Sequence, residues 1–189
     1  MSVVRFIGCL HFGHESVAKY RGWDNSQEHD EFLIHEWNKV VIKRDTTYIV
    51  GDITMEKATH YHKLNRLNGR KIVVLGNHDR HQDINFLLQY VDGVAGAVDY
   101  KGFIITHVPI HPNEVQFYRG NIHAHIHHVN RLEEVIVSDS YLDEDSKQAQ
   151  TLSKYYNVDA HLIEYAPLSV DELQGGKKYR NIMKQFKQE

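Results

Sequence analysis

Three short apolar runs each end in a glycine that is followed at once by polar side chains able to bind a metal. Each run is rich in β-branched and aliphatic residues and has the length of a buried strand. Glycine lets the backbone turn sharply there and approach a ligand closely. This repeated pattern constrains the fold more than any other feature of the chain. The runs and their glycines are residues 3–7 with Gly8, 46–50 with Gly51 and 71–75 with Gly76.

Segments with helical periodicity separate these three runs. After the first run we expect a helix that is capped by Ser26 and buries Leu33 and Trp37, together with Val40 and Val41, on one face. Between the second and third runs, residues 57–67 predict another helix, which stops before Gly69. Strands that alternate with helices over short connections are typical of a parallel α/β sheet.

The rest of the chain continues this α/β pattern within one domain spanning residues 1–189, the usual size of a single domain. The acidic stretch within residues 130–155 is expected to be a solvated insert, or a partner surface as the alternative. The basic, amphipathic terminal helix at 176–189 could pair two copies of the chain. Further elements are expected as a helix at residues 83–91, a hairpin of 95–100 with 102–106, and a strand at 156–165.

Composition narrows the partners and the compartment. Lys and Arg number 22 against 25 Asp and Glu, a net charge of −3, so a nucleic acid is not the favoured partner. Cys9 is the only cysteine, which excludes a disulfide scaffold and fits a reducing compartment. We find no signal peptide and no membrane-length apolar stretch, and therefore expect a cytoplasmic protein without a membrane partner. The 15 histidines point to metal binding.

The polar residues after the strands are expected to converge. The carboxyl ends of parallel strands open on one crevice, where ligands bind in α/β sheets. Side chains at i and i+2 of an extended segment share a face, which pairs Cys9 with His11 and His123 with His125. The candidate ligands are Cys9, His11, Asp52, Asn77, His78, His107, His123 and His125.

The ordered set of Cys9-Leu10-His11, Gly51-Asp52, Gly76-Asn77-His78-Asp79, His107 and His123-Ala124-His125 resembles the calcineurin-like metallophosphoesterase superfamily. It is most similar to the small single-domain phosphoesterases of bacteria and their phages. The resemblance covers about residues 3–127 and resumes at 156–173.

This resemblance implies an α/β fold of two packed mixed β-sheets flanked by helices, a four-layer sandwich with the site at the sheet ends. It also implies two divalent metal ions: Mn, Fe, Zn or Ni. His78 would lie just outside the metals as an acid or a transition-state stabiliser, with Asp79 orienting its imidazole. Carried over by motif, the ligands are Cys9, His11 and His125 on the first metal, Asn77, His107 and His123 on the second, and Asp52 bridging both.

The implied activity is hydrolysis of a phosphate ester, most closely a phosphodiester in a nucleotide or related small molecule. A hydroxide that bridges the metals would attack phosphorus in line. Arg21 and Arg80 are candidates to bind the substrate phosphate, as is Arg119, since Arg suits bidentate phosphate recognition. Surface placement is the alternative for each of them. His14 and Asn38 are candidates to support the metal ligands.

Two positions depart from the family pattern. Cys9 stands where the family has Asp, and Asn121-Ile122 replaces the glycine before the final pair of histidines. Cys9 is open to three interpretations: a native ligand that favours zinc or iron, a non-ligand that weakens one metal site, or an introduced inactivating change. A buried inert cysteine is the structural alternative.

The rival hypothesis is a weakened or inactive family member that serves as a binding module, and Cys9 is the feature that favours it. A nuclease or repair factor is a third, less favoured candidate. Among the other histidines, His29, His35, His60, His62 and His81 are expected at the surface. His111, His127, His128 and His161 lie nearer the site in sequence but receive no assigned role.

Overall fold

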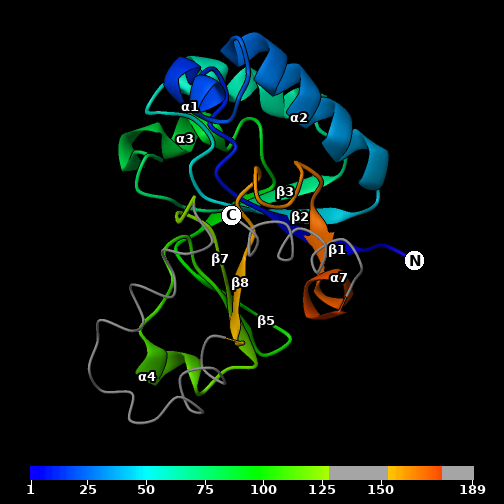
Figure 1. Cartoon of the computed structure of the whole chain (residues 1–189), viewed down its shortest axis with the longest axis vertical. Coiled ribbons are helices and arrows are strands. Elements are labelled where there is room, and N and C mark those ends of the chain that lie inside the picture. The colour runs from blue at the N-terminus through cyan, green and yellow to red at the C-terminus, as the bar shows by residue number, and fades with distance from the viewer. Residues whose placement is uncertain (128–152, 176–189) are drawn as a thin grey trace.

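The computed structural model describes residues 1–127 and 153–175, which form an α/β structure of two mixed β-sheets flanked by helices (Figure 1). In chain order the elements are β1 (Val4–Ile7), α1 (Glu15–Tyr20), α2 (Ser26–Val40), β2 (Thr46–Val50), the 3₁₀ helix η1 (Ala58–Arg66), β3 (Arg70–Val74), the 3₁₀ turn η2 (His81–Asp83), α3 (Ile84–Leu87), β4 (Gly93–Ala95), β5 (Val98–Tyr100), β6 (Phe103–Ile105), α4 (Pro112–Val115), β7 (Gly120–His123), β8 (Tyr155–Asn157), β9 (Leu168–Ser169) and α7 (Val170–Gly175).

The first sheet contains all three glycine-terminated strands. Its order is β4-β3-β2-β1-β9, and β1 to β4 run parallel while β9 pairs antiparallel with β1. The predicted parallel arrangement of the three runs is confirmed. Their carboxyl ends therefore open on the same edge of the sheet.

The second sheet has the order β5-β6-β7-β8, with the predicted hairpin confirmed as the antiparallel pair β5 and β6. Strands β6, β7 and β8 are parallel to one another. The two sheets meet through aromatic side chains, because Phe6 of β1 stacks on Tyr48 of β2 and meets Tyr100 of β5, each with ring centroids 5.7 Å apart. The loops that follow the parallel strands of the two sheets lie next to each other, since Gly8 after β1 forms a bridge with Asp159 after β8.

Helices α1, α2 and α3 gather on the side of the first sheet that faces away from the second (Figure 1). The predicted face of α2 is buried, and the indole of its Trp37 donates to the carbonyl of Asn68 at 3.0 Å. The expected cap was wrong by one residue. Asn25 is the N-cap, since its side chain accepts from the backbone N–H of Glu28.

Three other predicted elements differ in type or length. In place of the helix expected at 57–67, Ala58–Arg66 form a 3₁₀ helix, because the buried side chains Tyr61, Leu64 and Leu67 recur every third residue, the period of that helix. The helix expected at 83–91 is reduced to α3, followed by turns with i to i+3 hydrogen bonds. The strand expected at 156–165 is only β8, because the Asp159 carboxylate accepts the backbone N–H of His161 and turns the chain.

The acidic stretch between residues 130 and 152 and the terminal helix at 176–189 lie outside the described residues. Across residues 1–127 and 153–175, we find no helix with both the length and the apolar character needed to cross a membrane.

Candidate metal centre

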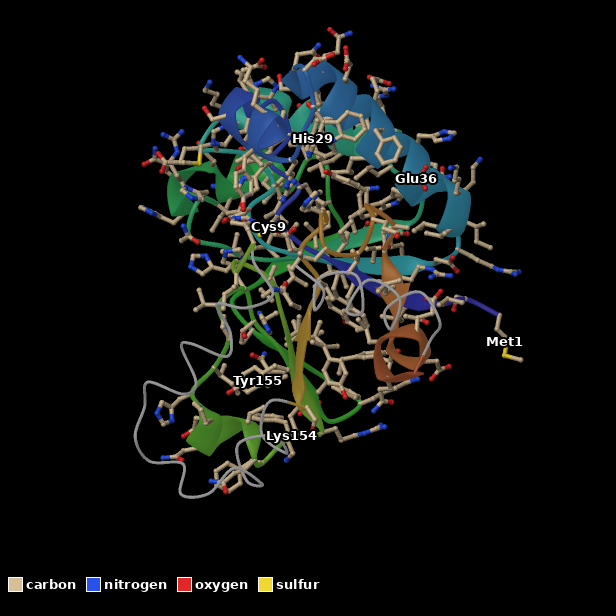
Figure 2. The ribbon with its side chains drawn as sticks, viewed as in Figure 1. Met1, Cys9, His29, Glu36, Lys154 and Tyr155 are labelled. Carbon is tan, nitrogen blue, oxygen red and sulfur yellow. The ribbon has the colours of Figure 1, made fainter. Side chains whose placement is uncertain are left out.

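The loops that follow the strands of both sheets are tied together by backbone hydrogen bonds. Cys9 N–H donates to Gly51 at 2.9 Å, and Ala124 N–H donates to His107 at 3.0 Å. Gly8 joins the two sheets, since its N–H donates to Val158 at 2.8 Å. Figure 2 shows Cys9 near the middle of the molecule, between the helices and the second sheet. The predicted convergence of the strand ends is therefore observed.

Four candidate ligands have left-handed backbone conformations. The φ angles are 53° for Cys9, 49° for His11, 54° for Asp52 and 66° for His125. Such conformations cost roughly 1–3 kcal/mol each for a residue with a side chain, and they cluster at functional sites. The surrounding hydrogen bonds hold these residues so that their side chains face one another.

Two of the strand-end glycines make room for ligand side chains. A Cβ on Gly76 would lie 2.6 Å from the backbone nitrogen of Asp52 and also collide with the Asp52 carboxylate. Gly51 has a φ of +74°, and a Cβ there would collide with the His107 imidazole. The glycines that mark the ends of the strands in the sequence thus allow the close approach of Asp52 and His107.

Asp52, His107 and Asn77 form one group of donors. Nδ1 of His107 lies 2.9 Å from the carbonyl of Val50, which can only accept, so the ring proton sits on Nδ1. Nε2 of His107 then directs its lone pair at the Asn77 side-chain oxygen, 3.0 Å away, and at the Asp52 carboxylate, 3.3 Å away. A cation between these three groups would satisfy all of them.

The charges around His107 and Asp52 act on the pKa values of both groups. Burial tends to lower the pKa of His107, but the Asp52 carboxylate outweighs it and the pKa is raised. Burial tends to raise the pKa of Asp52, but its hydrogen bond and charge interaction with His107 outweigh it and the pKa is lowered. Both shifts show that this position favours positive charge.

Cys9 lies between two groups of ligand-type side chains and belongs to both. Its sulfur is within 4.8 Å of donor atoms of Asp52 and His107, and equally of donor atoms of His11 and His127. The side chain is fully buried, and its sulfur accepts the backbone N–H of His125 at 3.2 Å. Burial, with the charges of Asp159 and Asp52, holds the thiol pKa well above its usual value.

His11 and His123 carry buried ring nitrogens with no hydrogen-bond partner in the described part of the chain. Both nitrogens of His11 are of this kind, and its Nε2 is 3.9 Å from the Asp52 carboxylate, too far for a hydrogen bond. Nδ1 of His123 faces the Ala124 carbonyl at 2.9 Å, so its unpaired Nε2 carries the lone pair. Burial lowers the pKa of His11 to about 3 and that of His123 to about 4, which keeps both rings neutral.

His127 and Asp159 belong to the site, and sequence reasoning gave neither of them a role. His127 lies with Cys9 and His11, and its Nδ1 is 2.7 Å from the buried Asp159 carboxylate. A signal for His127 was present, because it continues the alternation of His123 and His125. Asp159 had no such signal, since it lies 32 residues further along the chain.

His125 lies beside His107, and its backbone N–H donates to the Cys9 sulfur. Its ring lies 5.1 Å from that of His107 and is half-buried. Among the described residues it is His127 that completes the close group with Cys9 and His11. The ligand role of His125 on the first metal stays a prediction.

His78 and Asp79 sit beside the donors in different ways. The backbone N–H of His78 donates to Asp52 at 3.0 Å, and its ring lies 6.1 Å from that of His11. The carboxylate oxygens of Asp79 accept three backbone N–H groups, those of Asp52, Ile53 and Gly76, rather than the His78 imidazole. Glu56, which the sequence did not single out, is the acidic side chain near His78, at 3.6 Å from Nδ1.

The structure corrects the expected surface placement of Arg21 and His29. Arg21 is buried, and its two terminal nitrogens contact the Cys9 carbonyl at 2.9 Å, Asp159 at 3.1 Å and His29 at 3.0 Å. These internal bonds argue against the phosphate-binding role expected for Arg21. His29 of α2 is fully buried, and it pairs with Arg21 on one side and Asp30 on the other.

The remaining candidates lie at the edge of the site or away from it. Arg80 is exposed and pairs with Asp83 at 2.8 Å, so its substrate role stays a prediction. The His14 ring lies 5.9 Å from that of His11, in reach of a supporting role. Asn38 instead bonds to the backbone of Arg66 and Asn68, which fixes α2 to the segment before β3.

The donors as a whole fit a divalent cation. A buried imidazole nitrogen without a partner costs roughly 1–3 kcal/mol, and a metal ion is a natural partner for it. A histidine that binds a metal through one ring nitrogen usually donates the N–H of its other ring nitrogen to a carbonyl or carboxylate. His107, His123 and His127 all have this arrangement.

The fold and the site together define an α/β protein with groups of side chains at the strand ends of two sheets that could hold a metal ion. The chain belongs to the family of the uncharacterized protein MJ1445 of Methanocaldococcus jannaschii, to which it is 31% identical over 191 residues, covering 96% of this chain and 97% of the relative. No family model matches the chain.

Two phage proteins and one solved structure are also similar. The gene 66 protein of Mycobacterium phage L5 is 38% identical over 90 residues, covering 45% of this chain and 44% of that protein. The gene 66 protein of Mycobacterium phage D29 is 40% identical over 84 residues, 42% of each chain. The crystal structure of the protein of unknown function AQ665 from Aquifex aeolicus shares the fold, with a TM-score of 0.65 and 23% identity over 91% of this chain and 97% of that one.

Proposed function

We propose that the protein is a metal-dependent phosphoesterase of the calcineurin-like type, with a four-layer sandwich fold and two divalent metal ions. Its substrate class is a phosphodiester in a nucleotide or related small phosphate ester. The single observation that carries the proposal is the set of imidazole nitrogens at the strand ends that lack a hydrogen-bond donor. His107 directs its Nε2 lone pair at Asp52, and the buried nitrogens of His11 and His123 have no partner among the described residues.

The residues divide between two cations. Asp52, Asn77, His107 and His123 would hold one ion, and Cys9 and His11 with Asp52 would hold the other. Divalent metal ions supply Lewis-acid stabilisation of a phosphoryl group and lower the pKa of water so that a nucleophile forms near neutral pH. The fixed tautomer of His107 keeps its Nε2 available to such an ion at no cost in reorganisation.

His78 has the position of a proton donor to the leaving oxygen. Its side chain is 24% exposed at the edge of the donor cluster, so a substrate can reach it, whereas His11 and His123 are buried. Its backbone is fixed by the hydrogen bond to Asp52. The Glu56 carboxylate, 3.6 Å from Nδ1, can orient the imidazole toward a substrate.

The test is hydrolysis of bis-p-nitrophenyl phosphate and p-nitrophenyl phosphate by the full chain with Mn²⁺, Ni²⁺ or Zn²⁺ added. We expect metal-dependent turnover, faster on the diester. His78→Ala should lose about 10²- to 10⁴-fold in kcat with its metal content unchanged. His81→Ala, a nearby exposed histidine, is the control. Absence of turnover with every metal would refute the proposal.

The alternative, an inactive family member that serves as a binding module, keeps one observation in its favour. The Cys9 thiol is buried, is held in the protonated form by burial, and accepts a backbone N–H, all of which suit an inert side chain. The Cys9→Asp variant separates the two cases. Activity that appears only in this variant would show that the natural chain is not a catalyst.

The compartment and the partners follow from the same proposal. We propose a cytoplasmic protein, because a lone cysteine at a candidate metal site suits a reducing environment. A small phosphate ester is a better substrate than a nucleic acid for a chain with a net charge of −3.

A further inference from the structure

The outer face of α2 and the loop before it form a groove that is separate from the candidate metal centre. Its volume is about 610 Å³, and it is lined by Trp23, Glu28, Glu31 and Phe32 together with three other polar side chains. We name it the α2 groove. Phe32 is 37% exposed there, and aromatic side chains that face solvent in a hollow are typical of binding surfaces.

Two aromatic rings form the apolar part of the α2 groove, and the core holds them in place. The rings of Trp23 and Phe32 are tilted with their centroids 4.8 Å apart, and each also contacts the ring of Tyr165. The indole N–H of Trp23 donates to the Tyr165 hydroxyl at 3.0 Å, and Tyr165 is buried. The rings are therefore ordered before a partner arrives, which lowers the entropy cost of binding.

The rim of the α2 groove is acidic. Glu28 and Glu31 line it, whereas no Lys or Arg does so within the part of the chain that the structure describes. Arg66 pairs with Glu31 at 2.5 Å and offsets its charge. The Glu28 carboxylate instead accepts the neutral amide of Asn25 at 3.0 Å, and the exposed Asp24 lies beside Asn25 in the loop. Aromatic faces next to carboxylates favour a basic partner that also carries apolar side chains.

The C-terminal segment 177–187 has the complementary chemistry in its sequence. It contains five basic residues and no acidic one. Tyr179, Ile182, Met183 and Phe186 follow the spacing i, i+3, i+4 and i+7, with which one face of an amphipathic helix enters a groove. The segment thus combines an apolar stripe with positive charge, as the α2 groove requires.

The position of α7 favours the segment of a second copy over that of the same chain. α7 ends at Gly175 and lies on the other side of the first sheet from α2 (Figure 1). Tyr179, the first apolar residue of the stripe, follows four residues later and so within about 14 Å. The first sheet and α2 itself lie between α7 and the outer face of α2. Because packed layers are about 10 Å apart, crossing two of them exceeds that span.

We propose that residues 177–187 of one copy dock in the α2 groove of a second copy, and that the reciprocal contact closes a two-fold dimer. Trp23 and Phe32 receive the apolar stripe, and Glu28 faces the basic residues. Both copies contribute the same two surfaces, as a two-fold interface requires. The dimer depends neither on a metal ion nor on the proposed activity.

The first test is the oligomeric state of the full chain, measured by sedimentation velocity over a range of protein concentrations. We expect a dimer that weakens as salt is raised, because ions screen the contact between opposite charges. Phe32→Ala and Glu28→Lys should each raise the dimer dissociation constant by about tenfold or more, since each change is present in both contacts. Phe117→Ala and Glu114→Lys, the same changes at exposed positions in and after α4, are the controls and should leave it unchanged.

A mixture of two variants that each fail alone identifies the contact. The first variant combines Phe32→Ala with Glu28→Lys and keeps its segment 177–187. The second combines Lys178→Glu, Arg180→Glu and Lys184→Glu and keeps its α2 groove. Each should be monomeric alone, whereas the mixture should form a heterodimer through the one intact groove and the one intact segment. Circular dichroism checks that each variant is folded.

A full chain that stays monomeric at every concentration would overturn the inference. So would a dimer whose dissociation constant is unchanged by Phe32→Ala and Glu28→Lys, because the two segments would then pair with each other instead of with the groove. Absence of a heterodimer in the mixture of folded variants would also contradict the proposed contact.

Discussion

Asp79 is predicted to hold the ends of β2 and β3 together, and its replacement should be among the most destabilising single changes near the site. Its Oδ2 accepts the backbone N–H groups of Asp52 at 2.8 Å and Gly76 at 2.9 Å, and its Oδ1 accepts that of Ile53 at 3.1 Å. The side chain is 7% exposed, so little water can replace these bonds.

The magnitude follows from the three donors. Asp79→Ala leaves three buried N–H groups without their acceptor, at roughly 1–3 kcal/mol each, and we expect a loss of about 3–6 kcal/mol. Asp79→Asn keeps one oxygen, which can retain the two bonds of Oδ2. Burial, with a contribution from the Asp52 charge, raises the pKa of Asp79, so removing the charge recovers part of the cost. We expect a loss of about 1–2 kcal/mol for Asn.

The assay is urea denaturation of the chelator-treated full chain, followed by tryptophan fluorescence and extrapolated linearly to water. Asp24→Asn, at an exposed position before α2, is the control and should change stability by less than about 0.5 kcal/mol. An Asp79→Ala protein as stable as the natural chain would refute the reasoning. If Asp79→Asn left stability unchanged but altered the pH profile of hydrolysis, Asp79 would act through His78 as the family resemblance implies.

Three further outcomes are expected. Gly76→Ala should lose about 1–3 kcal/mol of stability and weaken zinc binding, because its Cβ would lie 2.6 Å from the Asp52 nitrogen, whereas Gly96→Ala meets open space and should change neither in urea and zinc titrations. The chelator-treated protein should lose stability as the pH falls from about 7 toward 4. The reason is that the unfolded chain takes up protons from pH 6.5 downward, while His11 and His123 in the folded chain do so only near their lowered pKa values of about 3 and about 4. A urea midpoint that is flat between about pH 7 and 5 would contradict this. Zinc at about 100 times its dissociation constant should add about 2.7 kcal/mol and raise the melting temperature by roughly 5–10 °C in calorimetry, and equal melting temperatures with and without zinc would exclude a folded-state zinc site.

The strands and the region of the site could be predicted from local patterns. Each apolar run closes with a glycine, and parallel strands place their carboxyl ends at one edge, so Cys9, His11 and Asp52 were expected together and are found so. Asn77 and His107 also meet as expected, at 3.0 Å. These predictions needed only the residue order and the period of a strand.

Local patterns were less informative where spacing was ambiguous. Tyr61, Leu64 and Leu67 fit both an α-helix and a 3₁₀ helix in sequence, and the burial of every third residue decided for the latter. The strand expected after residue 156 ends early because the Asp159 side chain competes for backbone N–H groups. Such competition depends on where a side chain points.

The buried polar network could not be predicted at all. Arg21 and Asp159 are 138 residues apart, and each would cost free energy if buried alone, so neither reads as an interior residue in the sequence. Burial becomes acceptable only because the fold brings the two charges to 3.1 Å and adds Cys9 and His127 to the same network. His29 is buried for the same reason.

The sequence by itself determined the parallel arrangement of the first three runs, the glycine turns and the set of donors that follows them, because these depend on short-range periodicity and on the chemistry of single residues. Tertiary structure alone decided that His127 rather than His125 lies with Cys9 and His11, and that Asp159 holds it. The physical reason is that the direction of the His127 ring, beyond the end of β7, is set by the carboxylate of Asp159. The two residues are 32 positions apart in the chain, and no local sequence pattern encodes their contact.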